Sequence, residues 1–206
     1  GGTGPGRSTI LRLLMRYADV SGDAVRIWGQ DVRSMKPDQV RELFAPVFQY
    51  DYICSGTIED NICFGRVLER KKVEQAAECA QAMEFITGRK GGLSAFVEAG
   101  GKNLSGGQRQ RLLIARALAG EEDVLVFVDS FSALDYSTNL QLLRRMRAQY
   151  GSRTVIIVSQ RIGSVMEADR ILVMEGGRAA GYGTHVQLVQ NCPVYREIWQ
   201  SAASDM

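Results

Sequence analysis

Three short apolar runs rich in β-branched residues most constrain the fold of this chain. They occupy residues 124–128, 155–158 and 171–174. Continuous apolar runs of this length are typical of strands that are buried on both faces, as the strands of a parallel sheet are. The segment between the first two runs has apolar residues at helical spacing and ends at Gly151, a typical helix C-cap. This order of strand, helix and strand predicts an α/β layer fold with a mostly parallel sheet.

The middle of the chain has a different pattern. From residue 69 to 85 apolar residues recur at intervals of three and four, and no strand-like run occurs before residue 124. This pattern predicts an α-helical lobe inserted into the α/β lobe. We expect the α/β lobe to comprise residues 1–48 and 122–206, and the helical lobe to comprise residues 49–121.

Composition excludes some classes of protein. The 25 basic and 23 acidic residues give a formal net charge of +2, which does not favour a nucleic-acid partner. No apolar run approaches the roughly 18–20 residues that span a bilayer. The four cysteines are widely and irregularly spaced, with no C-x-x-C pair, and favour a reduced, cytosolic setting.

The chain begins with GGTGPGRST, which has the spacing of a phosphate-binding loop, G-x-x-x-x-G-K-[ST]. Glycines in such a loop let backbone N–H groups converge on phosphate oxygens at a helix N-terminus, and Ser8 can offer its hydroxyl to magnesium. Two residues depart from the motif. Arg7 replaces the lysine, and its wide planar fork does not substitute for a compact ammonium. Pro5 removes a backbone N–H. Taken alone, the loop is equally compatible with a glycine-rich turn before a helix.

The segment LSGGQRQR at residues 104–111 is far more specific. It resembles, residue for residue, the signature motif of ATP-binding cassette (ABC) proteins. Ser105 can cap a helix whose first turn holds Gly106 and Gly107, which leaves bare N–H groups for an incoming phosphate. The alternative is a capped helix with a purely structural role, which the order of the following motifs disfavours.

Other segments resemble the same family in the expected order. The run at 124–128 ends in Asp129, as a Walker B strand does, and this carboxylate can reach magnesium through water. Residues 132–135 resemble the D-loop, and Phe48-Gln49 resembles the Q-loop. The phrases at residues 55–58, 98–103 and 183–185 are most similar to exporter-type cassettes.

The resemblance implies a P-loop NTPase (RecA-like) lobe with an inserted helical lobe, ATP and Mg²⁺ as cofactors, and ATP hydrolysis. It implies a second cassette packed head to tail, so that each nucleotide lies between the Walker loops of one cassette and the signature of the other. It also implies a transmembrane domain fused before residue 1, and hence a place at the cytoplasmic face of a membrane. On this basis we expect the chain to be truncated at its Walker A loop.

The family pattern also assigns roles to individual residues. The residues expected to contact nucleotide are Gly1, Gly4, Gly6, Arg7, Ser8, Thr9, Ser105, Gly106, Gly107, Gln108 and Asp135. Those expected at the metal are Ser8, Gln49 and Asp129, and those at catalytic positions are Gln49, Ser130 and Gln160.

Three of these positions depart from active cassettes, in which a glutamate follows the Walker B aspartate and polarises the attacking water. Ser130 stands there, and losing a placed general base costs about 10²–10⁴ in rate. Gln160 replaces the family's switch histidine and cannot take up positive charge. Because Arg7 is altered too while the signature is intact, we predict one half of a heterodimeric exporter. Its own site binds nucleotide and hydrolyses it slowly or not at all, and its signature completes the partner's site.

Three other functions remain open at this stage. A homodimeric exporter ATPase could tolerate the replacements. A non-transport ABC ATPase of DNA repair or translation would lack a membrane domain, but the near-neutral charge and the exporter-like phrases count against it. A P-loop kinase would not explain residues 104–111. A decayed gene is the remaining explanation of the three substitutions.

Overall fold

The computed structural model describes residues 5–48 and 50–204. The chain divides into two compact units, which are described separately. One unit comprises residues 45–159, and the other comprises residues 1–44 together with 160–206. In the described part of the chain, no helix has the length and apolar character needed to cross a bilayer.

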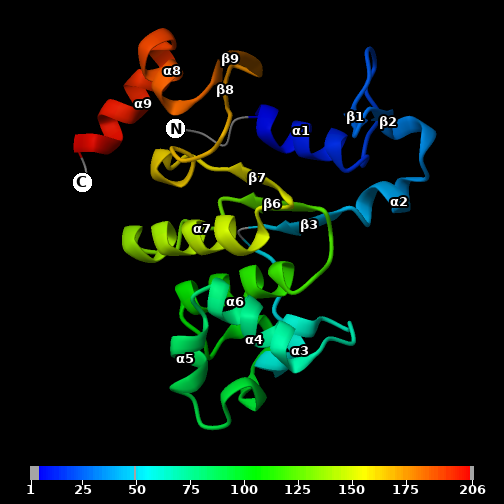
Figure 1. Cartoon of the computed structure of the whole chain (residues 1–206), viewed down its shortest axis with the longest axis vertical. Coiled ribbons are helices and arrows are strands. Elements are labelled where there is room, and N and C mark those ends of the chain that lie inside the picture. Colours follow the sequence, from blue (N-terminus) through cyan, green and yellow to red (C-terminus); the bar gives the residue numbers. More distant parts are fainter. Residues whose placement is uncertain (1–4, 49, 205–206) are drawn as a thin grey trace. The chain divides into compact units, whose positions relative to one another are not determined.

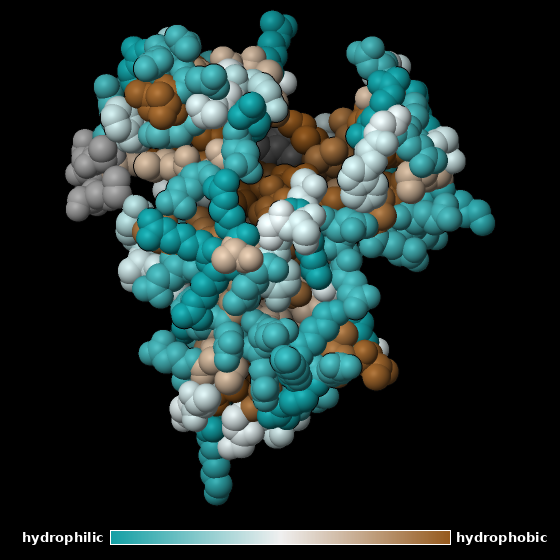
Figure 2. Space-filling model, viewed as in Figure 1, coloured by the Kyte–Doolittle hydropathy of each residue, from teal (hydrophilic) through white to brown (hydrophobic). Residues whose placement is uncertain are grey.

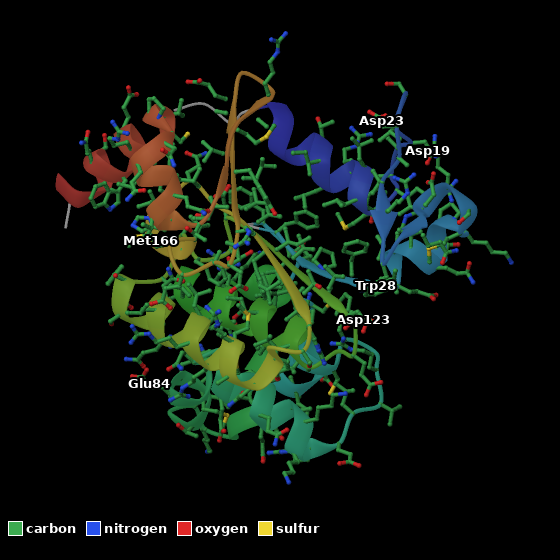
Figure 3. The ribbon with its side chains drawn as sticks, turned by 45° about the horizontal axis from the view of Figure 1, so that its top comes forward. Asp19, Asp23, Trp28, Glu84, Asp123 and Met166 are labelled. Carbon is green, nitrogen blue, oxygen red and sulfur yellow. The ribbon has the colours of Figure 1, made fainter. Side chains whose placement is uncertain are left out.

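The sheet of the first unit contains the two apolar runs that most resemble buried strands. Its strands β3 (Phe44–Val47), β6 (Val124–Val128) and β7 (Thr154–Val158) lie in that order (Figure 1). β6 and β7 are parallel, with Val124 opposite Thr154 and Val128 opposite Val158. The carbonyl of Asp123, labelled in Figure 3, accepts the N–H of Thr154 and fixes this register from the start of the pair. The α/β fold with a parallel sheet is thus confirmed.

Helices make up most of the remainder of this unit. They are α3 (Ile58–Cys63), α4 (Arg70–Cys79), α5 (Met83–Thr87), α6 (Gly106–Leu118) and α7 (Tyr136–Tyr150), with short 3₁₀ turns η2 (Gly92–Ser94) and η3 (Ala99–Gly101). A two-residue ladder joins β4 (Gly56–Thr57) to β5 (Phe96–Val97). The helical pattern at 69–85 forms two helices rather than one, because Gln81 adopts a left-handed conformation with φ 58° between them.

One apolar core holds these helices and the sheet together. Val73 and Ala76 of α4, Leu112 of α6, and Leu125 and Phe127 of β6 belong to the same cluster of buried side chains. This shared core explains why β6, α7 and β7 fall in one unit with the helices. The lobe boundaries expected from sequence, at residues 48/49 and 121/122, remain a prediction.

The other unit contains two hairpins and the terminal helices. Its elements up to residue 44 are α1 (Pro5–Leu14), β1 (Arg26–Ile27), β2 (Gln30–Asp31), η1 (Val32–Ser34) and α2 (Pro37–Arg41). Those after residue 160 are η4 (Ile162–Ser164), β8 (Ile171–Glu175), β9 (Arg178–Gly183), α8 (His185–Asn191) and α9 (Pro193–Ser204). Trp28 lies in the tight turn of the first hairpin (Figure 3), where it and Gly29 both have positive φ.

The apolar run at 171–174 is a strand, but its predicted environment was wrong. β8 pairs antiparallel with β9, and Ile171 and Val173 are buried while Leu172 is 47% exposed. The glycine turn at residues 176–177, with φ 54° and 79°, folds the chain straight back, as a two-residue hairpin loop with two left-handed residues does. Only one face of β8 is buried, but because the exposed residue Leu172 is also apolar, the sequence reads as an uninterrupted apolar run.

The end of the chain folds into two short helices. Thr184 caps α8, because its hydroxyl accepts the N–H of Gln187. The two helices are separate because Pro193 begins α9 and biases the preceding Cys192 toward an extended backbone. Hydrophilic residues cover most of the face drawn in Figure 2, which agrees with the apolar residues being gathered into cores.

Candidate functional site

The glycine-rich segment leads directly into a helix. Gly6, Arg7, Ser8 and Thr9 lie in the first turns of α1, and Pro5 occupies its first position, where a missing N–H costs no helical hydrogen bond. A helix N-terminus offers the free N–H groups that a phosphate loop needs. Gly1 and Gly4 lie outside the described residues, as do the side chains of Arg7 and Ser8. Their roles toward nucleotide remain predictions.

The signature segment forms the N-terminus of α6. The hydroxyl of Ser105 accepts the N–H of Gln108 at 3.2 Å, and the amide oxygen of Gln108 accepts the N–H of Ser105 at 3.1 Å. This reciprocal capping box holds the tip of the helix, and Ser105 and Gly106 are exposed. The tip therefore presents N–H groups without side chains in front of them, which suits a phosphate.

Gly107 joins this tip to the D-loop. A Cβ on Gly107 would lie only 3.2 Å from the carbonyl oxygen of Ala133, so a side chain there would push the two segments apart. The glycine therefore has a packing reason as well as the expected binding role. The structure brings the signature and the D-loop together.

Asp135 caps the helix that follows the D-loop. Its carboxylate accepts hydrogen bonds from the hydroxyl of Ser137 at 2.6 Å, from the hydroxyl of Thr138 at 2.7 Å and from the N–H of Thr138 at 2.9 Å. These donors hold the pKa of Asp135 well below its usual range. The geometry gives this carboxylate a capping role in α7, and a contact with nucleotide remains a prediction.

Asp129, expected at the metal, and Ser130, expected at a catalytic position, follow β6 and have different surroundings. Asp129 is partly exposed, has a left-handed backbone with φ 48°, and donates its N–H to the carbonyl of Val158 at 2.8 Å. Ser130, which we expected where a general base faces water, has no exposed surface. Its hydroxyl donates to the carbonyl of Val47 in β3 at 2.7 Å.

Gln49 itself lies outside the described residues, but its neighbours form a defined turn. The carboxylate of Asp51 accepts the N–H of Phe48 at 2.7 Å, and partial burial raises the pKa of Asp51. The remaining expected residue, Gln160, is exposed and follows the end of β7 by two residues.

Arg116 is a residue of this region that sequence reasoning missed. Its guanidinium donates to the carbonyls of Asn61 and Tyr52 at 2.8 and 2.9 Å and to the side-chain oxygen of Asn61 at 3.0 Å, and it lies 4.1 Å from the ring centre of Phe64. It thus ties α6 to α3 and to the segment after Gln49. The available signal was a charged residue inside the apolar stretch LLIARAL, because a charge there needs internal partners.

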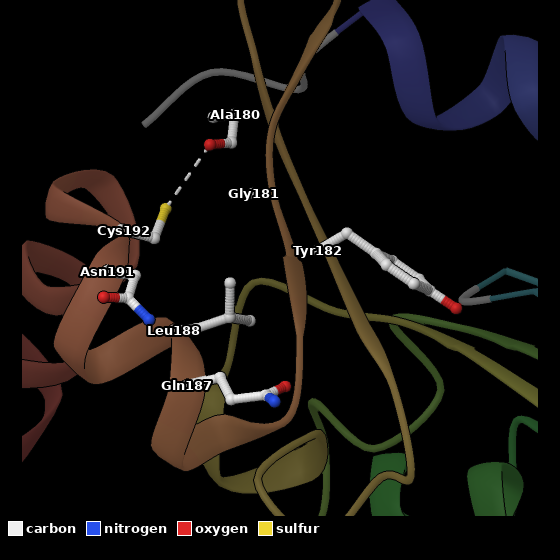
Figure 4. Close-up of a pocket in the computed structure, with 7 residues that line it drawn as sticks. All are labelled: Ala180, Gly181, Tyr182, Gln187, Leu188, Asn191 and Cys192. Atoms are coloured by element: carbon white, nitrogen blue, oxygen red, sulfur yellow. Dashed lines mark hydrogen bonds between the residues drawn. The ribbon is translucent and has the colours of Figure 1, made fainter.

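No other described feature competes with these motifs. A hollow of about 340 Å³ between β9 and α8 is lined by Tyr182, Gln187, Cys192 and their neighbours, and contains none of the motif residues (Figure 4). Within residues 5–48 and 50–204, no group of three or more His, Cys, Asp or Glu side chains is placed to hold a metal ion.

The fold and these motifs define a nucleotide-binding cassette, and comparison with known proteins identifies the family. A family model described as ABC transporter matches residues 1–130. The chain belongs to the ABC transporter family, whose ATPase domains bind ATP with Mg²⁺ and hydrolyse it.

Similar proteins support this assignment along nearly the whole chain. The chain is 39% identical over 201 residues to an uncharacterised ABC transporter ATP-binding protein of Mycobacterium tuberculosis (strain ATCC 25618 / H37Rv), covering 96% of this chain and 34% of that protein. It is 36% identical over 200 residues to the ATP-dependent lipid A-core flippase of Vibrio vulnificus (strain CMCP6), with the same coverage. The chain therefore spans about a third of the length of these curated relatives.

A solved structure is similar in fold as well as in sequence. The structure of a bacterial Atm1-family ABC exporter with ATP bound matches with a TM-score of 0.91 and 36% sequence identity. The match covers 98% of this chain and 36% of that chain.

Proposed function

We propose that this chain is the ATP-binding domain of an ABC exporter that works as a head-to-tail pair of different cassettes. The observation that carries the proposal is the intact tip of α6, where Ser105 and Gln108 cap each other and only glycines follow. In a head-to-tail pair this tip serves the nucleotide on the partner's phosphate loop. When bound, ATP would supply the phosphoanhydride bond whose hydrolysis drives transport, and Mg²⁺ would neutralise charge on its phosphates.

The chain's own phosphate loop is proposed to bind nucleotide and to hydrolyse it slowly. Arg7 replaces the compact lysine, Gln160 replaces a side chain that can carry positive charge, and no glutamate is present at the end of β6. A nucleotide that is bound there without being hydrolysed still favours the state in which the two cassettes are closed on each other, provided that it binds more tightly to the closed state than to the open one. The site then acts as a clamp.

The membrane partner is proposed from the lengths and names of similar proteins. The chain spans about a third of a flippase and of an exporter, so a transmembrane domain on the same polypeptide fits the remaining length. Such a domain would place this unit at the cytoplasmic face of a membrane.

The experiment that tests the proposal uses the full-length protein assembled with its partner in membranes. We expect Ser105→Arg to abolish ATP turnover, because a long cation at the helix tip blocks an incoming phosphate and removes the cap. Ser201→Arg places the same side chain on the exposed face of α9 and is expected to leave turnover unchanged. Gln160→Ala is expected to reduce turnover only modestly, because the partner's loop performs most of the hydrolysis.

Two results would contradict the proposal. Rapid turnover by the full-length chain without a partner would support a homodimeric exporter instead. Photolabelling with a radioactive ATP analogue can identify the loop beside which product accumulates, and product found chiefly beside Arg7 would exclude the clamp.

A further inference from the structure

Ser130 is enclosed by the protein rather than directed at a binding site. It has no exposed surface, and its hydroxyl lies 2.7 Å from the carbonyl oxygen of Val47 and 3.3 Å from that of Val128. A serine hydroxyl has one proton, and here the short contact with Val47 takes it. Phe131, the next residue, is 1% exposed and packs on Phe127 with ring centres 5.3 Å apart. Both residues after Asp129 therefore belong to the interior.

A glutamate cannot occupy position 130 in this backbone. It would add three heavy atoms to a closed space and would bring a buried carboxylate close to the carbonyl oxygen of Val47, which repels it. The position that polarises water in an active cassette must instead have access to solvent. Ser130 therefore does not occupy the position of a lost general base.

Asp129 meets that requirement. It directly follows β6 and is partly exposed. The bond from its N–H to the carbonyl of Val158, together with its left-handed backbone, fixes where the side chain leaves the strand end. Its carboxylate is one methylene shorter than that of glutamate.

We propose that Asp129, and not Ser130, takes the place of the general base, and that Val128 takes the place of the metal-binding aspartate. The inference rests on the proposed function. The two acidic residues are consecutive in active cassettes, so moving the base to residue 129 moves the metal ligand to residue 128. The side chain of Val128 has no oxygen to offer a metal ion, and the end of β6 therefore carries one carboxylate where two are needed. Ser130 is a structural residue that ties the end of β6 to β3.

The first test distinguishes the two assignments by metal binding. It uses the full-length protein assembled with a partner whose own phosphate loop has been disabled. Binding of Mn²⁺ in the presence of ATP is measured by electron paramagnetic resonance. Asparagine also tolerates a left-handed backbone, so Asp129→Asn is expected to fold. We expect Asp129→Asn to leave Mn²⁺ affinity within about twofold of wild type and Val128→Asp to raise it several-fold. A tenfold loss of Mn²⁺ affinity in Asp129→Asn would overturn the proposal.

The second test needs no nucleotide. Ser130→Glu is expected to lower the thermal unfolding temperature by roughly 5–10 °C, because a carboxylate is forced against a buried carbonyl, and Ser130→Ala is expected to lower it less. Ser130→Glu is also expected to leave hydrolysis beside Arg7 unchanged. An unchanged unfolding temperature together with faster hydrolysis there would overturn the proposal. Failure of the proposed function is distinguishable, because the full-length chain would then either hydrolyse ATP rapidly without a partner or bind no Mn²⁺ with ATP in the wild-type assembly.

Discussion

Asn61 holds together the segment that follows the Q-loop, and its replacement gives the sharpest test of the packing. The side chain is fully buried. Its oxygen accepts the N–H of Cys54 at 2.9 Å and a guanidinium N–H of Arg116 at 3.0 Å. Its amide nitrogen donates to the carbonyls of Cys54 and Thr57 at 2.9 and 3.0 Å. Asn61→Ala removes all of these bonds at once.

The size of the effect follows from those bonds. Each neutral hydrogen bond contributes about 0.5–1.5 kcal/mol net, and the one from Arg116 contributes about 1.5–3 kcal/mol. Truncation also leaves the partly buried backbone groups of Cys54 without this partner, although Arg116 retains the carbonyls of Asn61 and Tyr52. We expect a loss of roughly 3–5 kcal/mol in the free energy of unfolding. For a chain of this size, this corresponds to a fall of roughly 6–20 °C in the unfolding temperature.

The assay is urea unfolding followed by circular dichroism, supported by calorimetry. Asn191→Ala is the matched control, because Asn191 is exposed at the end of α8, and its change is expected to stay within about 0.5 kcal/mol. If Asn61→Ala costs less than about 1 kcal/mol, the network around Cys54 does not stabilise the fold, and the reasoning is refuted.

Two further predictions concern titration and reactivity. Hydrogen bonds from Arg33 lower the pKa of Asp31 from 3.8 to about 2. The ionised carboxylate therefore stabilises the folded state fully at pH values above the pKa of Asp31 in the unfolded chain, and this stabilisation is lost as the pH falls through the folded-state pKa. The stability difference between wild type and Asp31→Asn is therefore expected to be constant from pH 5 to 7 and to shrink between pH 4 and 2; a constant difference down to pH 2 would contradict it. Burial raises the pKa of Cys79 to about 12, whereas Cys54 is partly exposed, so iodoacetamide at pH 8 is expected to label Cys54 well before Cys79. Mass spectrometry of peptides measures both rates, and equal rates would refute the packing around α4.

The sequence predicts those parts of the fold that depend on the order of apolar and polar residues within one short segment. The run that became β6 is apolar at every position and four of its five residues are buried, so its environment is visible in the residues themselves, whereas the apolar residues 155–158 of β7 are only partly buried. The run that became β8 is equally apolar, but Leu172 faces solvent and the strand pairs in a hairpin. Apolar content alone does not distinguish these environments, and the glycine turn after β8 was the better guide.

The same distinction applies to the site. Ser105 and Gln108 are three residues apart, so their capping box could be read directly from the motif. The bond from Ser130 to Val47 joins residues 83 positions apart, and those from Arg116 to Tyr52 and Asn61 span 64 and 55 positions. No spacing rule reports such contacts, because they depend on how the sheet and helices pack. The family pattern could therefore suggest a role for Ser130 that its surroundings do not allow.

The way α6 is held explains how a cassette can lose its own chemistry and keep its signature. The tip of the helix is fixed by its own capping box and by the fit of Gly107 against Ala133, and its C-terminal half is fixed by Arg116. These contacts all lie within residues 45–159, whereas Arg7 and Gln160 belong to the other compact unit. Selection on the partner's site can maintain α6 while the chain's own site changes, which is the combination that a pair with one clamp and one working site requires.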